Sequence, residues 1–193
     1  MNNKGHLYLI MWTSGSGKWT LRKNLEKLEI KDLEFVKSYV SRPMREWEVE
    51  GDIYYFVSGE KFQEMINNDE FLEYEWVHNA AYYGTRLRDV VENGIHAWKK
   101  VMTEMEIEWL KSTLKNYPEL KENMTSIFLS LTPEKLYERI EARWAHMSEE
   151  DFKNREKSLV KEVREAKEYC DYIIDTSEKT PEEVLEEVKK ILA

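Results

Sequence analysis

A short apolar run that leads straight into a glycine-rich turn limits this chain to few folds. The run Leu7-Tyr8-Leu9-Ile10-Met11 is typical of a strand buried on both faces of a parallel sheet. Thr13-Ser14-Gly15-Ser16-Gly17-Lys18 follows, and leucines at helical spacing come next. In such a setting, backbone N–H groups and a helix N-terminus bind phosphate while the lysine neutralises its charge. The segment predicts a phosphate loop made of Ser14, Gly15, Ser16, Gly17, Lys18 and Thr20.

The rest of the 193 residues alternates between strand and helix patterns. We expect strands over 34–40, 53–57, 71–77, 100–105, 126–131 and 172–174, and helices over 59–68, 109–117, 149–169 and 181–192. A further helix is expected to open at Thr132-Pro133-Glu134, with Thr132 as its N-cap. Such alternation predicts an α/β fold with a parallel β-sheet core flanked by helices. The stretch 41–92 interrupts the alternation, so we expect an inserted subdomain there.

Charge and composition exclude several functions. The formal net charge is −9, which argues against binding to nucleic acid or to an anionic membrane as the main activity. No apolar run is long enough for a membrane span. Cys170 is the only cysteine, so there is no intrachain disulfide and no cysteine zinc site. We therefore expect a cytoplasmic protein.

The phosphate loop departs from its usual pattern at two positions. The pattern G-x-x-x-x-G-K-[ST] requires glycine at 12 and a small residue at 19, and both positions hold tryptophan. We expect an indole at position 12 to clash with the loop or to fill the phosphate site. Taken alone, the segment therefore leaves open a chance Gly-Ser-Gly-Lys turn.

A second segment carries a more specific pattern. Ser38 is followed by Ser41-Arg42-Pro43-Met44-Arg45, then by Glu48, Gly51, Tyr54 and Phe56-Val57-Ser58. This order resembles the nucleotide-acceptor segment of guanylate kinases. The resemblance runs from about Leu7 to the C-terminus, through Phe71-Leu72-Glu73-Tyr74, Tyr82-Tyr83-Gly84-Thr85, Lys99-Lys100-Val101 and Glu104-Met105-Glu106 to Arg139, Arg143 and Arg155.

The resemblance implies an ATP-dependent kinase with the phosphate-loop fold that phosphorylates GMP and dGMP with the help of Mg²⁺. It implies a core over 1–40, 93–138 and 156–193, a GMP-binding subdomain over 41–92 and a short lid over 139–155. ATP and GMP are then the partners, and we expect a monomer or a homodimer.

The acceptor residues suit a purine monophosphate. Arg42 and Arg45 lie three residues apart, and two guanidinium groups can grip one phosphate bidentately. Tyr54 and Tyr83 can each donate a hydroxyl hydrogen to the same phosphate. The resemblance places the guanine contacts at Ser38, Glu73, Thr85 and Glu104. A solvated arginine pair, core tyrosines and an exposed strand carboxylate are the ordinary alternatives.

The donor side combines the phosphate loop with late arginines. Phosphoryl transfer needs positioning and charge neutralisation more than covalent chemistry. The resemblance assigns these roles to Lys18 with Arg139, Arg143 and Arg155, and the magnesium contact to Thr20 and, through water, Glu106. The family usually has aspartate at 104 and 106, where this chain has glutamate.

Six of the seven tryptophans stand where the family has glycine or another small residue: Trp12, Trp19, Trp47, Trp98, Trp109 and Trp144. Trp76 alone falls in an ordinary strand position. The chain has seven glycines, about half of average usage. Because GGA becomes UGA by one base change, our hypothesis is that the gene comes from a lineage that reads UGA as glycine, and that its UGA codons were translated as tryptophan. If the tryptophans are present, we expect severe loss of ATP binding, with position 12 the worst, and strain at Trp109 and Trp144.

Two other functions stay open from the sequence. One is a catalytically inactive, guanylate-kinase-like module that binds a phosphorylated ligand in the acceptor pocket, which the altered phosphate loop favours. The other is a kinase for a different monophosphate, which the pair Glu73 and Glu104 disfavours because two acceptors suit the N1–H and N2 amine of guanine.

Overall fold

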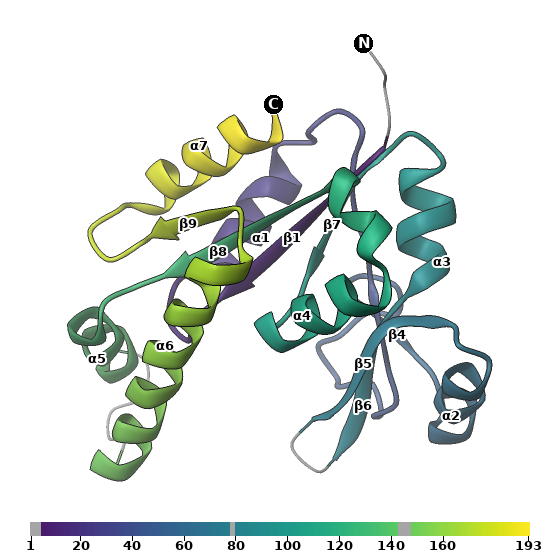
Figure 1. The fold of residues 1–193 in the computed structure, drawn as a ribbon. Coiled ribbons are helices and arrows are strands. Elements are labelled where there is room, and N and C mark those ends of the chain that lie inside the picture. The colour runs from purple at the N-terminus through teal and green to yellow at the C-terminus, as the bar shows by residue number, and fades with distance from the viewer. Residues whose placement is uncertain (1–4, 78–79, 143–147) are drawn as a thin grey trace. The chain divides into compact units, whose positions relative to one another are not determined.

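The computed structural model describes residues 5–77, 80–142 and 148–193, and it has an α/β fold with two sheets (Figure 1). The first is a parallel sheet of five strands flanked by helices, as expected. Its strands, in spatial order, are β2 (Leu33–Phe35), β7 (Lys100–Glu104), β1 (His6–Trp12), β8 (Met124–Ser130) and β9 (Tyr172–Asp175).

Strand β1 is buried along its length. Leu7, Leu9 and Met11 are fully buried, and so is their neighbour Ile10. Because successive side chains of a strand point to opposite faces, burial of consecutive residues means that both faces are covered. The continuous apolar run therefore forms a central strand of the sheet, as the sequence predicts.

The second sheet has four strands in the order β4 (Tyr54–Phe56), β3 (Ser38–Val40), β6 (Ala81–Arg86) and β5 (Phe71–Val77). The pair β3–β4 is parallel, whereas β6 runs antiparallel to both β3 and β5. Register pairs Ser38 with Tyr54 and Glu73 with Thr85. This sheet therefore brings four predicted acceptor residues onto paired strand positions.

The long helices lie where the sequence predicts helices. They are α1 (Lys18–Lys27), α2 (Gly59–Asn67), α4 (Ile107–Asn116), α5 (Pro133–Glu141), α6 (Glu149–Tyr169) and α7 (Pro181–Leu192). Thr132 and Thr180 cap α5 and α7 through their side-chain oxygens, with proline in the first turn of each helix. None of the helices within the described ranges is both long enough and apolar enough to cross a membrane.

The predicted elements were wrong at one place and incomplete at three. The strand expected over 34–40 is two strands, β2 and β3, which belong to different sheets. The chain leaves the first sheet at Val36, whose N–H still donates to the Met102 carbonyl at 2.8 Å. Three further elements were not predicted: strand β6, the helical stretch α3 (Leu87–Val90) with the short π-helix η1 (Val91–Ile95), and the short 3₁₀ helix η2 (Pro118–Asn123).

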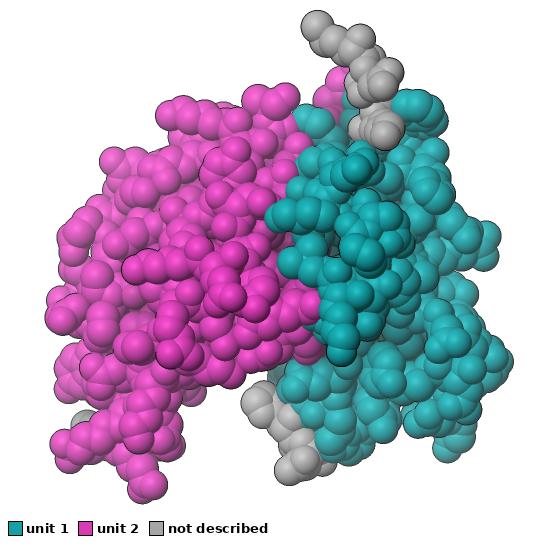
Figure 2. Space-filling view, viewed as in Figure 1, with its two compact units in different colours: residues 1–7, 32–103, 112–124 teal, residues 8–31, 104–111, 125–193 magenta. Residues whose placement is uncertain are grey.

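The chain divides into two compact units, coloured separately in Figure 2. Unit 1 comprises residues 1–7, 32–103 and 112–124, and unit 2 comprises residues 8–31, 104–111 and 125–193. Within unit 1, α2 packs on the second sheet through Phe62, Met65 and Phe71. Within unit 2, α5 packs against α6 through Leu136, Ile140 and Leu159.

Candidate functional site

The phosphate loop lies in unit 2, between β1 and α1. Gly15 and Gly17 have φ values of 81° and 93°, which lie in the left-handed region that favours glycine. The Ser16 N–H donates to the Thr13 carbonyl at 3.2 Å and closes the turn. Helix α1 then begins at Lys18 with no side-chain cap at Gly17, and the first N–H groups of a helix have no partner within the helix. The turn therefore has the backbone form that phosphate binding requires.

The phosphate-loop lysine is held by two side chains of unit 2. The Lys18 Nζ atom lies 2.8 Å from a Glu104 carboxylate oxygen and 3.5 Å from the centroid of the Trp12 ring. Trp12 ends β1 in extended geometry, so its backbone is not strained. The indole instead contacts the loop lysine through its ring. The effect expected for position 12 on phosphate binding stays a prediction.

Two of the predicted lid arginines contact the phosphate loop. Arg155 donates from Nη1 to the Ser14 hydroxyl at 3.0 Å. Arg139 donates to the Gly15 carbonyl at 3.1 Å and to the carbonyls of Thr176 and Ser177 at 2.5 and 3.4 Å. Arg143 and Trp144 lie outside the described residues.

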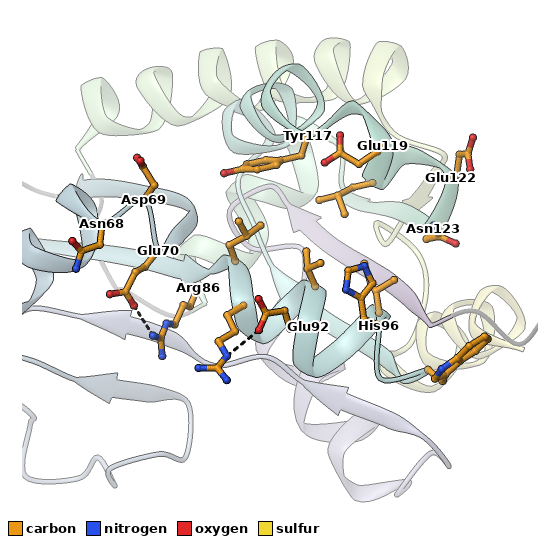
Figure 3. Close-up of a pocket in the computed structure, with 16 residues that line it drawn as sticks. Asn68, Asp69, Glu70, Arg86, Glu92, His96, Tyr117, Glu119, Glu122 and Asn123 are labelled. Carbon is orange, nitrogen blue, oxygen red and sulfur yellow. Dashed lines mark ion pairs between the residues drawn. The ribbon is translucent and has the colours of Figure 1, made fainter.

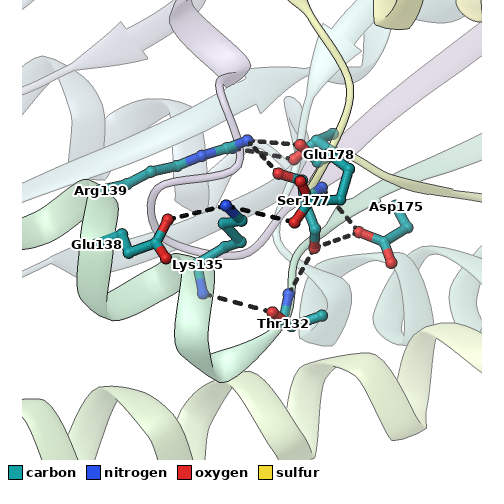
Figure 4. A network of polar contacts seen from close by, with 8 residues as sticks. Thr132, Lys135, Glu138, Arg139, Asp175, Ser177 and Glu178 are labelled. Atoms are coloured by element: carbon teal, nitrogen blue, oxygen red, sulfur yellow. Dashed lines mark hydrogen bonds and ion pairs between the residues drawn. The ribbon is translucent and has the colours of Figure 1, made fainter.

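The loop after β9 is fixed to the start of α5 by the polar network in Figure 4. The Thr132 N–H donates to the Ser177 hydroxyl at 2.9 Å, and that hydroxyl donates to Asp175 at 2.6 Å. Burial would raise the pKa of Asp175, but hydrogen bonds from the Ser177 hydroxyl and N–H outweigh it, and the pKa is lowered. Asp175 therefore stays ionised and holds Ser177, next to the Thr176 contacts of Arg139.

A hollow of about 270 Å³ adjoins the phosphate loop within unit 2. Its lining combines predicted loop residues with a set that the sequence analysis missed: Thr176, Lys179, Pro181 and Val184. These residues follow the last strand of the parallel sheet, where ligands of open α/β sheets bind at the carboxyl ends of strands. Because the strand over 172–174 was predicted, the position of these residues just after it could have indicated them as lining residues.

The predicted phosphate grip of the acceptor lies in unit 1 and centres on Arg42. Its guanidinium makes a bidentate pair with Glu48, both N–O distances being 2.6 Å, and its Nε donates to the Tyr83 hydroxyl at 2.8 Å. The rings of Tyr54 and Tyr83 meet edge to face, with centroids 5.8 Å apart. Three predicted residues, Arg42, Tyr54 and Tyr83, therefore form one cluster.

Arg45 is exposed, and its guanidinium carbon lies 5.8 Å from the centroid of the Trp47 ring. Its N–H donates to Glu48 at 2.8 Å, so both arginines of the motif contact the same glutamate. The Arg42 hydrogen bonds are the main cause that lowers the pKa of Glu48 to about 2, and the Arg45 N–H adds to it. Glu48 therefore holds Arg42 as a carboxylate at neutral pH.

Glu73 and Thr85 face each other across β5 and β6, and both are buried. A carboxylate is rarely buried in a protein, so the position of Glu73 differs from that of an exposed strand residue. Ser38 is half-buried on β3. Glu104, the second predicted guanine contact, lies in unit 2 and pairs with Lys18 and Arg22.

The tryptophans differ sharply in their backbone geometry. Trp98 has a φ of 63°, in the left-handed region. Its N–H donates to the Ile95 carbonyl and the Lys99 N–H to the Gly94 carbonyl, both at 3.1 Å, which is the helix-ending Schellman arrangement that prefers glycine at this position. The strain expected at Trp109 is not found, because this residue lies inside α4. Trp76 occupies an ordinary position on β5, as expected.

Unit 1 also contains a cavity of about 990 Å³, shown in Figure 3. Two ion pairs line it, Glu70 with Arg86 at 2.5 Å and Arg88 with Glu92 at 3.1 Å. None of the predicted acceptor residues is among the residues that line it. Size alone therefore does not identify the acceptor site in this chain.

A magnesium ion carried by a nucleotide suits the donor residues of unit 2. Within the described ranges, no group of three or more histidine, cysteine or acidic residues is arranged to hold a metal ion. Mg²⁺ bound through substrate phosphates needs only one or two protein oxygens and keeps several waters. Thr20, exposed beside the loop, and Glu106, exposed after β7, offer one hydroxyl and one carboxylate. The donor set fits this kind of magnesium site.

The glycine-rich loop on a parallel sheet, the arginine and tyrosine cluster of the second sheet and the relatives reported below together indicate the class of a nucleoside monophosphate kinase, a phosphotransferase. The family model "Guanylate kinase" matches residues 4–193. The chain belongs to the guanylate kinase family.

Individual relatives agree with the family match. A guanylate kinase from Wolinella succinogenes is 36% identical over 184 residues, which cover 95% of this chain and 82% of that protein. A guanylate kinase from Clostridium acetobutylicum is 35% identical over 178 residues, covering 91% and 80%. The crystal structure of guanylate kinase from Anaplasma phagocytophilum covers 98% of this chain and 85% of its own, with a TM-score of 0.69 and 23% identity, and shows the same fold.

Proposed function

We propose that this chain is a guanylate kinase that, with glycine at positions 12 and 19, phosphorylates GMP and dGMP with ATP as donor. The observation that carries the proposal is the acceptor cluster of unit 1, in which Arg42, Tyr54 and Tyr83 gather on a sheet that also buries Glu73 opposite Thr85. An arginine fork and two phenolic hydroxyls suit a monophosphate. A buried carboxylate suits the two adjacent N–H donors of guanine.

Selectivity for guanine follows from hydrogen-bond chemistry. Guanine presents N1–H and an N2 amine on one edge, and adenine does not offer that pair to a carboxylate. A site built around such donors rejects analogues that lack them, because its polar groups are then left unpaired. Glu73 is proposed as the main acceptor, with Ser38, Thr85 and Glu104 as further contacts. Arg45 is proposed as the second arginine of the phosphate grip.

On the donor side, the proposed roles follow from charge. Lys18, Arg139, Arg143 and Arg155 neutralise the transferring phosphoryl group, and the loop N–H groups hold the neighbouring phosphates. Thr20 and, through water, Glu106 would hold Mg²⁺, which supplies further charge neutralisation on the phosphate oxygens when bound. Closure of a lid over 139–155 would exclude water and limit wasteful hydrolysis of ATP.

Donor binding by the tryptophan-containing chain is proposed to be severely impaired. Lys18 has to leave both the Trp12 ring and Glu104 before it meets a phosphate. A cation over an indole face gains from about 0.5 to 2 kcal/mol or more, and the ring also occupies space beside the loop. Trp19 is half exposed at the start of α1, and we propose a smaller effect there.

The covered lysine also favours a second candidate function. A chain whose phosphate loop is blocked while its acceptor cluster is intact would bind a phosphorylated ligand without turnover. On this alternative, the chain is an inactive guanylate-kinase-like module. The contacts of Arg139 and Arg155 with the loop favour the enzyme instead, because a module without catalysis has no need for them.

The test is turnover of the Trp12→Gly/Trp19→Gly variant in a coupled ADP-release assay with GMP, dGMP and AMP as acceptors. Turnover with GMP and dGMP but not AMP is the expected result. Turnover with AMP instead would indicate another monophosphate kinase. GMP binding without any turnover would favour the binding module. The proposal places the protein in purine nucleotide metabolism in the cytoplasm, as a monomer or homodimer.

A further inference from the structure

Arg22 is a buried arginine one turn into helix α1. Its side chain is only 7% exposed, and it contacts two acids. The Nε atom donates to Glu26 at 2.8 Å, and Nη1 donates to Glu104 at 3.3 Å. A buried charge needs such partners, because desolvation without them is costly. Neither the phosphate-loop pattern nor the acceptor pattern of the sequence includes this arginine.

Glu104 connects Arg22 to the phosphate loop. Its Oε1 atom accepts from Arg22, and its Oε2 atom pairs with Lys18 at 2.8 Å. One carboxylate therefore bridges two cations, one buried and one at the loop. With Glu26, the cluster holds two positive and two negative charges, so it is balanced while Lys18 stays in it.

That balance changes when Lys18 turns to a phosphate. Glu104 then loses one counter-ion, and its side chain is only 24% exposed, so water replaces the lost contact only in part. Arg22 stays in place and keeps Glu104 paired. The lysine can therefore leave without stranding a partly buried charge.

We propose that Arg22 is a positioning residue that shares the charge of Glu104 and so allows Lys18 to exchange between this carboxylate and the phosphates of the donor nucleotide. The predicted effect on donor binding rests on the proposed function. The ion pair between Glu104 and Lys18 does not, because it exists in the nucleotide-free protein and can be measured there.

Loss of Arg22 changes the reactivity of the Lys18 amine in opposite directions if Arg22 is a positioning residue and if it is only structural. Without Arg22, the charge of Glu104 falls on Lys18 alone, so Lys18 is held more tightly. If Arg22 only anchors α1, its loss loosens the helix start and exposes Lys18. The two roles therefore predict opposite changes in the reactivity of the Lys18 amine.

The experiment measures the rate at which acetic anhydride labels Lys18 in the full, nucleotide-free chain, read by mass spectrometry of the Lys18 peptide. Arg22→Gln is expected to lower the rate by roughly two- to fivefold, the range of a partly exposed ion pair. Glu104→Gln is expected to raise it. Arg22→Gln added to Glu104→Gln is expected to change nothing, because the arginine acts through the glutamate. Arg22→Lys is expected to fall between Arg22→Gln and the parent.

Lys23→Gln, the next position on the same helix, is the matched control and is expected to leave the Lys18 rate unchanged. A higher Lys18 rate in Arg22→Gln, or an equal drop with and without Glu104, would overturn the proposal. The second measurement is calorimetry with ATP in the Trp12→Gly/Trp19→Gly background. There, Arg22→Gln should lower the affinity for ATP by a similar factor. Failure of that background to bind ATP would count against the proposed function, while the labelling rates would still decide the role of Arg22.

Discussion

The amine of Lys18 lies 3.5 Å from the centroid of the Trp12 ring and 2.8 Å from a carboxylate oxygen of Glu104. The cation that the loop provides for phosphate is therefore already engaged on two sides. In unit 1, the Arg42 guanidinium is engaged as well, because Glu48 pairs with both of its terminal nitrogens while Nε donates to Tyr83. Each half of the proposed reaction therefore has its main cation paired with a carboxylate, the donor half carries the Trp12 ring in addition, and each half can be tested by itself.

Trp98→Gly is expected to stabilise the chain. The φ of 63° costs a side-chain-bearing residue roughly 1–2 kcal/mol, and glycine removes that cost. Urea denaturation should show a higher free energy of unfolding, by about 1 kcal/mol. Trp98→Ala is the control, because it removes the indole but keeps Cβ. Equal stability of the glycine and alanine variants would show that the backbone is not strained at this position.

Trp109→Gly is expected to destabilise the chain, in contrast to Trp98→Gly. Trp109 is the third residue of α4, and glycine is disfavoured in a helix by up to about 1 kcal/mol relative to alanine. Thermal unfolding should therefore show a lower midpoint for Trp109→Gly than for the parent chain. A gain in stability at 109 as large as that at 98 would contradict the distinction drawn from their backbone angles.

The gene itself provides a test that needs no protein. Codons 12, 19, 47, 98, 109 and 144 are expected to be UGA, and codon 76 is expected to be UGG. The left-handed backbone at Trp98 supports this hypothesis, since a natural tryptophan is a poor choice there. UGG at all six positions would refute it.

Glu48 should make stability depend on pH in a defined window. Its pKa is lowered from 4.5 to about 2, first by the Arg42 hydrogen bonds. A carboxyl group with a lowered pKa in the folded state contributes stability above about pH 4.5, and that contribution is lost as the pH falls towards 2. The difference in unfolding free energy between the parent and Glu48→Gln should therefore shrink between these pH values. Glu46→Gln is the matched control, and a difference that stays constant down to pH 2 would contradict the assignment.

Glu73→Gln tests guanine recognition. A hydrogen bond to a charged group contributes about 1.5–3 kcal/mol, so GMP affinity should fall by roughly 10- to 100-fold in calorimetry. Glu75→Gln, an exposed position two residues along β5, is the control. Unchanged GMP affinity in Glu73→Gln, with an unchanged circular dichroism spectrum, would remove Glu73 from the site.

Local patterns predicted most of the elements, and contacts over long sequence separations were the part they could not predict. The apolar run of β1 and the caps of α5 and α7 are local signals, and each element forms where expected. Arg139 and Gly15 are 124 residues apart, so no local pattern indicates their hydrogen bond. The break between β2 and β3 depends on which sheet each half joins, and a continuous β-type pattern over 34–40 does not encode that choice.

In the candidate site, too, the sequence pattern predicted which residues belong to it but not the ion pairs that they form. The motif predicted Arg42, Tyr54 and Tyr83 as one cluster, because their spacing matches a known acceptor segment. It did not predict that Glu48 would engage both ends of the Arg42 guanidinium, or that Arg22 would share Glu104 with Lys18. The effect of position 12 was expected from sterics, whereas the strained tryptophan, Trp98, was identified only by its backbone angle.

Paired calorimetry of ATP and GMP on the same chain tests the account most directly. The tryptophan-containing chain is predicted to bind GMP and to show no micromolar binding of ATP with Mg²⁺, and Trp12→Gly/Trp19→Gly is predicted to restore ATP binding while GMP affinity stays the same. Trp76→Phe, on strand β5 of the second sheet, is the control and should not restore ATP binding. Micromolar ATP binding by the unsubstituted chain would contradict the account.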